Sequence, residues 1–354
     1  MDIVQKSLTI KDNEKLRTRA PMRISFAGGG TDIDHYFRKY NGAVINATVN
    51  KFAYVEIVRT DREFVAESLD FNKILIYEKN IEVGKIPKEL RLHLAVYEHI
   101  IRKFNNSKHL YIKLSSYVDA PIGSGLGSSS TLVVAMIKAF NELLLLGLDD
   151  YSIAGLAHQI EREDCGIKGG KQDQYSAAFG GINFIEFNKA NTIVNTLKIK
   201  NWFKCELESS LVLHFTGVSR LSSNVIEDQL QSVLQNNETA LNSLHEIKKE
   251  VYLMKNYLLN SDICGIKKII NEGWSYKKKT STSVSNDFID KRIKLGFDNG
   301  AEAAKVSGAG GGGFILFMCD PKDAIKLRNR LLEESTETFF CNFNDQGAQS
   351  WIVN

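Results

Sequence analysis

A glycine- and serine-rich segment between two apolar segments places the strongest constraint on how this chain folds. Residues 111–118 carry alternating apolar side chains, which predicts a β-strand. Residues 119–127 form a loop that contains three glycines. Residues 128–146 are apolar on most sides and are followed by Gly147, which predicts a buried helix with a glycine at its end. A strand, a glycine loop and a helix in this order are what a phosphate-binding loop requires.

The predicted loop has the chemistry of an anion site. Glycine has no Cβ, so the backbone can approach an anion closely. The free N–H groups of the first helical turn, together with the helix dipole, favour a phosphate at that position. A flexible glycine–serine turn without a ligand is the alternative. We predict that the following residues bind the phosphates of a ligand: Gly123, Ser124, Gly125, Leu126, Gly127, Ser128, Ser129 and Ser130.

Two familiar phosphate loops do not fit this segment. A Walker A loop has Gly-Lys-Ser/Thr where its helix begins, but residues 127–129 are Gly-Ser-Ser. A dinucleotide-binding loop has G-x-G-x-x-G after the first strand, and here the third glycine comes one residue early. Neither class therefore accounts for the loop.

Length and composition narrow the remaining possibilities. A chain of 354 residues is long for one hydrophobic core, so we expect two domains. An Asn- and Lys-rich stretch at 189–200 suggests a boundary that divides the chain into 1–195 and 196–354. The 45 basic residues nearly balance the 42 acidic ones, which argues against a nucleic-acid partner.

The apolar segments and the cysteines indicate where the protein works. No apolar run approaches the roughly 18 residues that a membrane span needs, and the first twenty residues lack the apolar region of a secretory signal. The five cysteines are scattered and form no C-x-x-C pair, which is typical of reduced thiols. We therefore expect a cytoplasmic protein.

Three segments in order resemble the motifs of one enzyme superfamily. Residues 120–130 (APIGSGLGSSS) are similar to the ATP-phosphate motif of the galactokinase, homoserine kinase, mevalonate kinase and phosphomevalonate kinase superfamily. Residues 20–32 (APMRISFAGGGTD) resemble its N-terminal motif, and residues 305–314 (KVSGAGGGGF) its C-terminal glycine motif. The resemblance covers almost the whole chain. It implies an α+β kinase with a ribosomal-S5-like N-terminal domain and a ferredoxin-like C-terminal domain, using ATP and Mg²⁺.

Details of these segments are similar to the D-glycero-D-manno-heptose 7-phosphate kinases. Residues 28–32 are Gly-Gly-Gly-Thr-Asp, where galactokinases carry a Glu-His pair, and residues 169–175 and 274–283 also resemble the heptose kinases. The resemblance implies a small sugar phosphate as acceptor, phosphorylated at its anomeric hydroxyl on the way to a GDP-activated heptose, by a monomer or homodimer. A same-fold kinase for another sugar or a mevalonate-type alcohol, and a catalytically silent sugar- and ATP-binding regulator, are the alternatives.

The resemblance assigns catalytic roles to three residues. Asp173 aligns with the catalytic aspartate, which accepts or orients the proton of the attacking hydroxyl. Arg23 stands where galactokinases place an arginine near the transferred phosphate, and Lys171 could balance charge beside Asp173. Without the resemblance, these residues also suit a helix cap, a strand-edge ion pair and a surface lysine, respectively.

Metal and acceptor sites follow from the same comparison. Ser129 and Glu161 are the predicted Mg²⁺ pair, although neighbouring serines and acidic residues make both assignments ambiguous. Asp32 should accept hydrogen bonds from sugar hydroxyls. The lysines at 277–279 could meet the phosphate of the acceptor or form a solvated face. The predicted acceptor-binding residues are Gly29, Gly30, Thr31, Asp32, Gly310 and Gly311.

Overall fold

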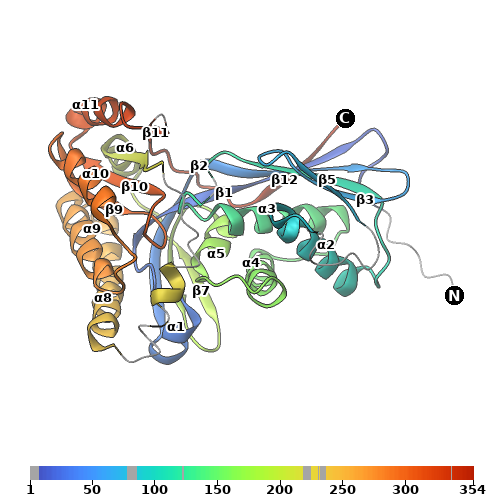
Figure 1. Ribbon diagram of the computed structural model, residues 1–354, viewed down its shortest axis with the longest axis horizontal. Coiled ribbons are helices and arrows are strands. Elements are labelled where there is room, and N and C mark those ends of the chain that lie inside the picture. Colours follow the sequence, from blue (N-terminus) through green and yellow to red (C-terminus); the bar gives the residue numbers. More distant parts are fainter. Residues whose placement is uncertain are drawn as a thin grey trace.

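The computed structural model describes residues 8–77, 86–121, 123–217, 225–229, 231, 237–335 and 337–354. Two β-sheets and two groups of helices make up these residues, which confirms the predicted α+β class. Figure 1 shows the larger sheet with its helices in one half of the molecule and the smaller sheet with its helices in the other. Among the described helices, none is long and apolar enough to cross a membrane.

The larger sheet is built around two long neighbouring strands, β1 and β2, which pair antiparallel. The strand order is β12-β1-β2-β5-β3-β4, and β6 pairs with β2 and with β7. Its strands are β1 (Lys15–Ala27), β2 (Gly42–Arg59), β3 (Phe64–Ser68), β4 (Lys73–Ile76), β5 (Ile112–Val118), β6 (Ile182–Phe187), β7 (Thr192–Thr196) and β12 (Gln349–Val353).

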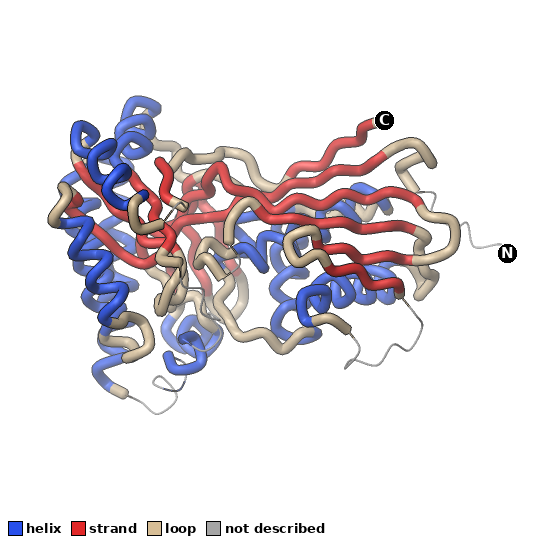
Figure 2. Tube along the Cα trace, turned by 45° about the horizontal axis from the view of Figure 1, so that its top comes forward, coloured by secondary structure: helices blue, strands red, loops and turns tan. Residues whose placement is uncertain are grey.

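One face of this sheet is covered by a layer of helices (Figures 1 and 2). Helix α3 packs directly on β1 and β2, and its apolar residues lie in the largest core cluster. Because α3 is buried on most sides, the phosphate loop that precedes it has a fixed position. The helices of this half are α1 (Asp34–Tyr40), α2 (Arg91–Phe104) after the short 3₁₀ turn η2 (Lys88–Leu90), α3 (Ser128–Leu143), α4 (Asp150–Gln159) and α5 (Gln172–Phe179).

The smaller sheet is antiparallel and has the order β11-β8-β10-β9. A core cluster joins it and helices α8 and α9 to the apolar residues of β1 and β2, so the two halves share buried contacts. Its elements are α6 (Asn201–Ser210), β8 (Leu211–Phe215), α8 (Glu238–Asn260), α9 (Ile263–Lys278), α10 (Asp287–Phe297), β9 (Ala301–Val306), β10 (Phe314–Cys319), α11 (Pro321–Leu332) and β11 (Thr338–Phe340).

Two further segments bear on the site. Helix α4 is followed directly by a wider π-helical turn, η3 (Ile160–Asp164), which carries Glu161. Helix α8 begins at Glu238, and most of residues 218–236 lie outside the described part. Strand β12 belongs to the predicted C-terminal domain, 196–354, but it pairs with β1 in the larger sheet. That boundary itself remains a prediction.

Candidate active site

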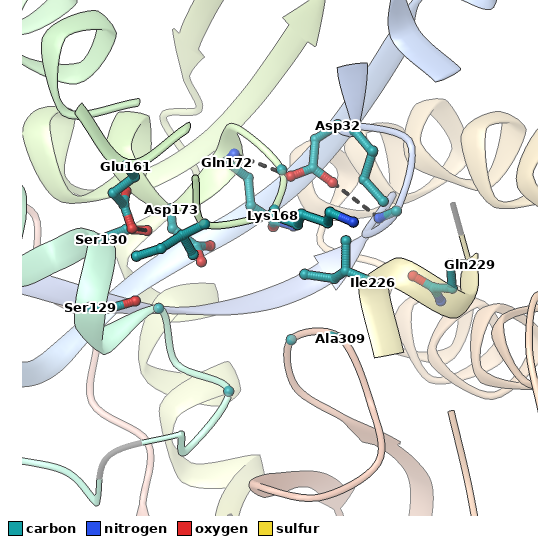
Figure 3. Close-up of a pocket in the computed structure, with 18 of the residues that line it drawn as sticks. Asp32, Ser129, Ser130, Glu161, Lys168, Gln172, Asp173, Ile226, Gln229 and Ala309 are labelled. Carbon is teal, nitrogen blue, oxygen red and sulfur yellow. Dashed lines mark hydrogen bonds between the residues drawn. The ribbon is translucent and has the colours of Figure 1, made fainter. Parts of the chain in front are cut away.

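A cavity of about 530 Å³ opens where the phosphate loop, the N-terminal glycine turn, α5 and α9 meet. Figure 3 shows Ser129, Ser130 and Glu161 at one end, Gln229 at the other, and Asp173 between them. The predicted site residues that line it are Arg23, Gly30, Asp32, Gly123, Gly125, Gly127, Ser128, Ser129, Ser130, Glu161 and Asp173. Residues more than 100 positions apart thus meet in one cavity.

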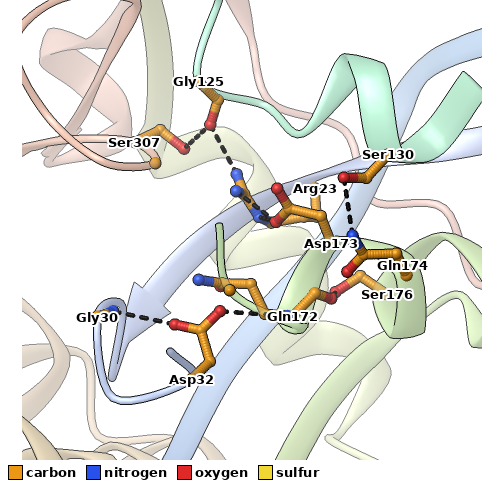
Figure 4. Close-up of polar contacts among 12 residues, drawn as sticks. Arg23, Gly30, Asp32, Gly125, Ser130, Gln172, Asp173, Gln174, Ser176 and Ser307 are labelled. Carbon is orange, nitrogen blue, oxygen red and sulfur yellow. Dashed lines mark hydrogen bonds and ion pairs between the residues drawn. The ribbon is translucent and has the colours of Figure 1, made fainter. Parts of the chain in front are cut away.

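Arg23 and Asp173 form a short ion pair at the centre of the cavity (Figure 4). The guanidinium nitrogens Nε and Nη2 lie 2.7 and 2.5 Å from Asp173 Oδ1, and Nη1 donates to the carbonyl of Gly125 at 2.7 Å. Arg23 is 3% exposed because it stands on the buried strand β1, whereas a quarter of the Asp173 side chain is accessible. The guanidinium therefore fixes the carboxylate against the phosphate loop and leaves Oδ2 toward the cavity.

Asp32 is held by two backbone amides. Its Oδ1 accepts from Gly30 N at 3.0 Å and its Oδ2 from Gln172 N at 3.2 Å, as Figure 4 shows. The Asp32 carbonyl also accepts from Lys171 N at 3.2 Å. These bonds join the N-terminal glycine turn to the start of α5, so Asp32 and Asp173 have fixed relative positions. A carboxylate in this setting still has lone pairs for sugar hydroxyls.

Glu161 is a buried carboxylate near the start of α3. Ser130 Oγ donates to its Oε1 at 2.9 Å, and Gln174 Nε2 donates to its Oε2. Burial raises the pKa of Glu161, because removal of water disfavours the charged form. The serine in contact is Ser130 and not the predicted Ser129, which is exposed and lines the cavity one residue earlier on the helix. The π-helical turn places Glu161 beneath Ser130.

The C-terminal glycine segment packs against the phosphate loop, backbone on backbone. A Cβ on Gly125 would lie 2.5 Å from the Ser307 carbonyl oxygen, and one on Gly308 would lie 2.7 Å from the Gly125 carbonyl oxygen. Both glycines also have positive φ, +77° and +79°. In addition, Phe314 N donates to Ser124 O at 2.8 Å. Close packing of these two loops explains the glycines of both motifs.

Several predicted residues do not line the cavity. Lys171 turns its ammonium onto the ring of Phe37, 4.8 Å from the ring centroid, so the prediction that it balances charge at Asp173 is not supported by its position. Thr31 is fully buried, and its hydroxyl lies 2.9 and 2.7 Å from the carbonyl oxygens of Gly28 and Ala43. These bonds stabilise the turn, and a role of Thr31 in binding the acceptor remains a prediction.

Four other predicted site residues also lie outside the cavity lining, because they are buried or packed against neighbouring backbone. Ser124 and Leu126 are fully buried, with Leu126 in the apolar core. Gly311 donates its amide to Val284 O, and a Cβ on Gly310 would lie 2.7 Å from that oxygen. In the C-terminal loop it is Gly308 and Ala309 that reach the cavity, a shift of two residues from the predicted acceptor contacts.

The structure shows which of the lysines at 277–279 faces the cavity, a question that the sequence left open. Of the three lysines at 277–279, Lys277 is buried, lines the cavity and donates to Gly308 O. Lys278 instead lies 3.8 Å from Asp290 on the surface, and Lys279 lies over Tyr276. The helical period of α9 separates the three side chains and could have suggested that only one faces inward.

The loop before α5 contributes a further cation that sequence reasoning missed. Lys168 lines the cavity and forms an ion pair with Glu227. Arg162 braces this loop by donating to the carbonyls of Ile167 and Gly170 at 2.9 and 2.8 Å. No sequence motif marked either residue.

Comparison with known proteins agrees with this geometry. Residues 91–181 match the model of the GHMP kinases N terminal domain, and residues 254–336 match the GHMP kinases C terminal domain. The chain is 42% identical to D-glycero-alpha-D-manno-heptose 7-phosphate kinase of Campylobacter jejuni over 96% of this chain and 99% of that protein. This chain belongs to the GHMP kinase family. It is therefore a phosphotransferase, and the family implies ATP as the phosphoryl donor.

Solved structures of GHMP kinases share the fold. A D-glycero-D-manno-heptose 1-phosphate kinase from Bacteroides thetaiotaomicron superposes with a TM-score of 0.79 and 36% identity, covering 96% of this chain and 99% of that chain. Lactococcus lactis galactokinase complexed with galactose superposes with a TM-score of 0.75 at 15% identity, over 96% of each chain, and shows likeness of fold alone. The GHMP kinase thus has the predicted two-domain kinase fold.

Proposed function

We propose that this GHMP kinase transfers the γ-phosphoryl group of ATP to the anomeric hydroxyl of D-glycero-D-manno-heptose 7-phosphate. The Campylobacter jejuni relative, 42% identical over nearly the full length, supports this acceptor. The observation that carries the proposal is the cavity itself, which Asp32, Asp173 and Lys277 line together with the phosphate loop. Together they offer hydroxyl acceptors, a base and a cation to one small anionic sugar. The product, a 1,7-bisphosphate, would serve the synthesis of a nucleotide-activated heptose in the cytoplasm.

In the proposed reaction Asp173 receives or orients the proton of the anomeric hydroxyl. The hydroxyl oxygen forms a bond to the γ-phosphorus while the bond from phosphorus to the bridging oxygen of ADP breaks. Arg23 holds one carboxylate oxygen at 2.5–2.7 Å, so the other oxygen is directed at the acceptor. The amides at the start of α3 stabilise the charge that develops on the phosphates.

The residues at the start of α3 fit a magnesium ion carried by the nucleotide. Among the described residues, no group of three or more His, Cys, Asp or Glu could hold a metal alone. Magnesium bound with ATP needs only one or two protein oxygens besides phosphate and water. Glu161, with Ser129 or Ser130, would supply them, and a cation would neutralise a carboxylate that is otherwise buried. When bound, the ion would neutralise charge on the β- and γ-phosphates.

The proposal is tested by ADP release with Mg²⁺ and ATP against a panel of acceptors. The panel contains D-glycero-D-manno-heptose 7-phosphate, sedoheptulose 7-phosphate, mannose, galactose, fucose and mevalonate. We expect turnover on the heptose phosphate that is abolished in Asp173→Ala. Turnover only on a neutral sugar or mevalonate would refute the acceptor while keeping the kinase. ATP binding without turnover on any acceptor would favour a silent regulator.

A further inference from the structure

Three polar side chains converge on one point above the α-carbon of Gly29. A Cβ atom placed on this glycine would lie 3.3 Å from Lys277 Nζ, 3.6 Å from Ser25 Oγ and 3.8 Å from Gln172 Nε2. The three side chains come from α9, β1 and α5, respectively, so both halves of the molecule contribute. All three groups can donate a hydrogen bond. The space that a side chain at position 29 would fill is therefore surrounded by donors.

These donors are buried, and the Lys277 ammonium, which donates to Gly308 O, has further protons to donate. Ser25, Gln172 and Lys277 are 3, 7 and 6% exposed, and the Ser25 hydroxyl has no hydrogen-bond partner among the described residues. Burial lowers the pKa of Lys277 to about 8. The nearby carboxylates are engaged elsewhere, because Asp32 accepts two backbone amides and Asp173 is paired with Arg23. A buried donor without a partner costs free energy, so such a cluster fits an acceptor brought by a ligand.

Backbone conformation does not explain why position 29 is glycine. Gly28 and Gly30 have φ of +90° and +105°, which favours glycine, but the φ of Gly29 lies outside the left-handed region. The atom nearest to a Cβ at position 29, at 3.3 Å, is the ammonium nitrogen at the flexible end of Lys277. Alanine would fit with a shift of a few tenths of an ångström. The absence of a side chain at position 29 is therefore tied to the three polar groups around it and is not required by the backbone turn.

We propose that Ser25, Gln172 and Lys277 form the subsite for the phosphate group that the acceptor sugar already carries, with one phosphate oxygen in the space above Gly29. The inference rests on the proposed function and assigns the acceptor's phosphate to the edge of the cavity, where Gln172 and Lys277 are lining residues and Ser25 and Gly29 are not. A further buried lysine, Lys305, donates to the carbonyl of Phe26 at 3.1 Å, and its pKa is lowered to about 7 by burial and then by Lys277. The donors match the oxygens of a phosphate monoester.

The subsite is tested by comparing two acceptors that differ only in the phosphate. ADP release is measured with D-glycero-D-manno-heptose 7-phosphate and with the unphosphorylated heptose, for the wild type, Gly29→Ala and Ser25→Ala. Lys278→Ala is the control, because that neighbouring side chain lies on the surface beside Asp290. We expect KM for the phosphorylated sugar to rise roughly tenfold or more in both variants, as for loss of a hydrogen bond to a charged group. KM for ATP and for the unphosphorylated heptose should stay within about threefold.

Two results would overturn the inference. An unchanged KM for the phosphorylated sugar in Gly29→Ala would mean that only water occupies the space. An equal rise of KM for both acceptors would mean a general disturbance of the turn. If the wild type phosphorylates neither acceptor, the proposed function fails, and calorimetry with inorganic phosphate in the absence of ATP decides the subsite separately. Weaker phosphate binding by Gly29→Ala than by Lys278→Ala would then support it, and equal binding or no binding would refute it.

Discussion

The pair formed by Arg23 and Asp173 allows catalysis and stability to be separated with two substitutions at one position. Asp173→Asn keeps the shape of the side chain and an oxygen that accepts from Arg23, but it cannot receive a proton. Asp173→Ala removes the acceptor altogether and leaves a guanidinium that is 3% exposed without its partner. Both variants should lose turnover, while only the alanine variant should lose much stability.

The expected losses of stability and of kcat follow from the burial of the pair formed by Arg23 and Asp173. Removing one partner of a fully buried ion pair costs about 3–5 kcal/mol. Because a quarter of the Asp173 side chain is accessible, we expect about 2–3 kcal/mol of unfolding free energy to be lost in Asp173→Ala. The asparagine variant retains a hydrogen bond from a charged donor, so about 1 kcal/mol should be lost. Loss of general-base catalysis should lower kcat by roughly 10²–10⁴ in both.

Urea unfolding measures the loss of unfolding free energy, and steady-state ADP release measures the loss of kcat. Asp34→Asn is the matched control, since the Asp34 side chain is 32% exposed, forms an i,i+4 pair with Arg38 at 2.8 Å and does not line the cavity. It should change stability by less than about 0.5 kcal/mol and leave kcat unaltered. A folded Asp173→Asn protein with kcat within tenfold of wild type would refute the proton-accepting role, and equal stability of the alanine variant and wild type would refute the buried pair.

Three further substitutions test residues that lie outside the cavity lining. Burial raises the pKa of Glu250 from its ordinary 4.5 to about 8, so its favourable contribution below pH 4.5 is lost as the pH rises toward 8. Urea unfolding of Glu250→Gln at pH 5 and 8 should therefore show a smaller decline in stability than the wild type, and an identical decline would contradict this. Thr31→Val should lower the unfolding free energy by about 1–3 kcal/mol, since it removes the buried hydroxyl that bonds to the Ala43 amide and to the Gly28 and Ala43 carbonyls, and a neutral effect in thermal or urea unfolding would count against the turn role. Lys171→Met should keep kcat within about threefold in the ADP-release assay, because the ammonium lies over Phe37, and a hundredfold loss would show that this lysine does balance charge at Asp173.

Local sequence patterns were sufficient to predict the strand and the helix that flank the phosphate loop. The buried strand before residue 119 and the apolar helix after residue 127 were predictable, because each has the periodicity of its element. The phosphate loop followed from its glycines. By contrast, the π-helical turn that carries Glu161 depends on how α4 packs, and no residue pattern indicated that Ser130, and not Ser129, would meet this carboxylate.

The glycines of the sequence predicted a phosphate loop, and the resemblance to a known superfamily predicted the α+β class and assigned expected roles to Arg23, Asp32 and Asp173. Only the tertiary structure decided which side chains face the cavity. It selected Lys277 from a run of lysines, directed Lys171 away from the site, and brought three polar side chains together around Gly29. The reason is physical: loops and helix ends are oriented by contacts with distant segments, and those contacts have no local periodicity to read.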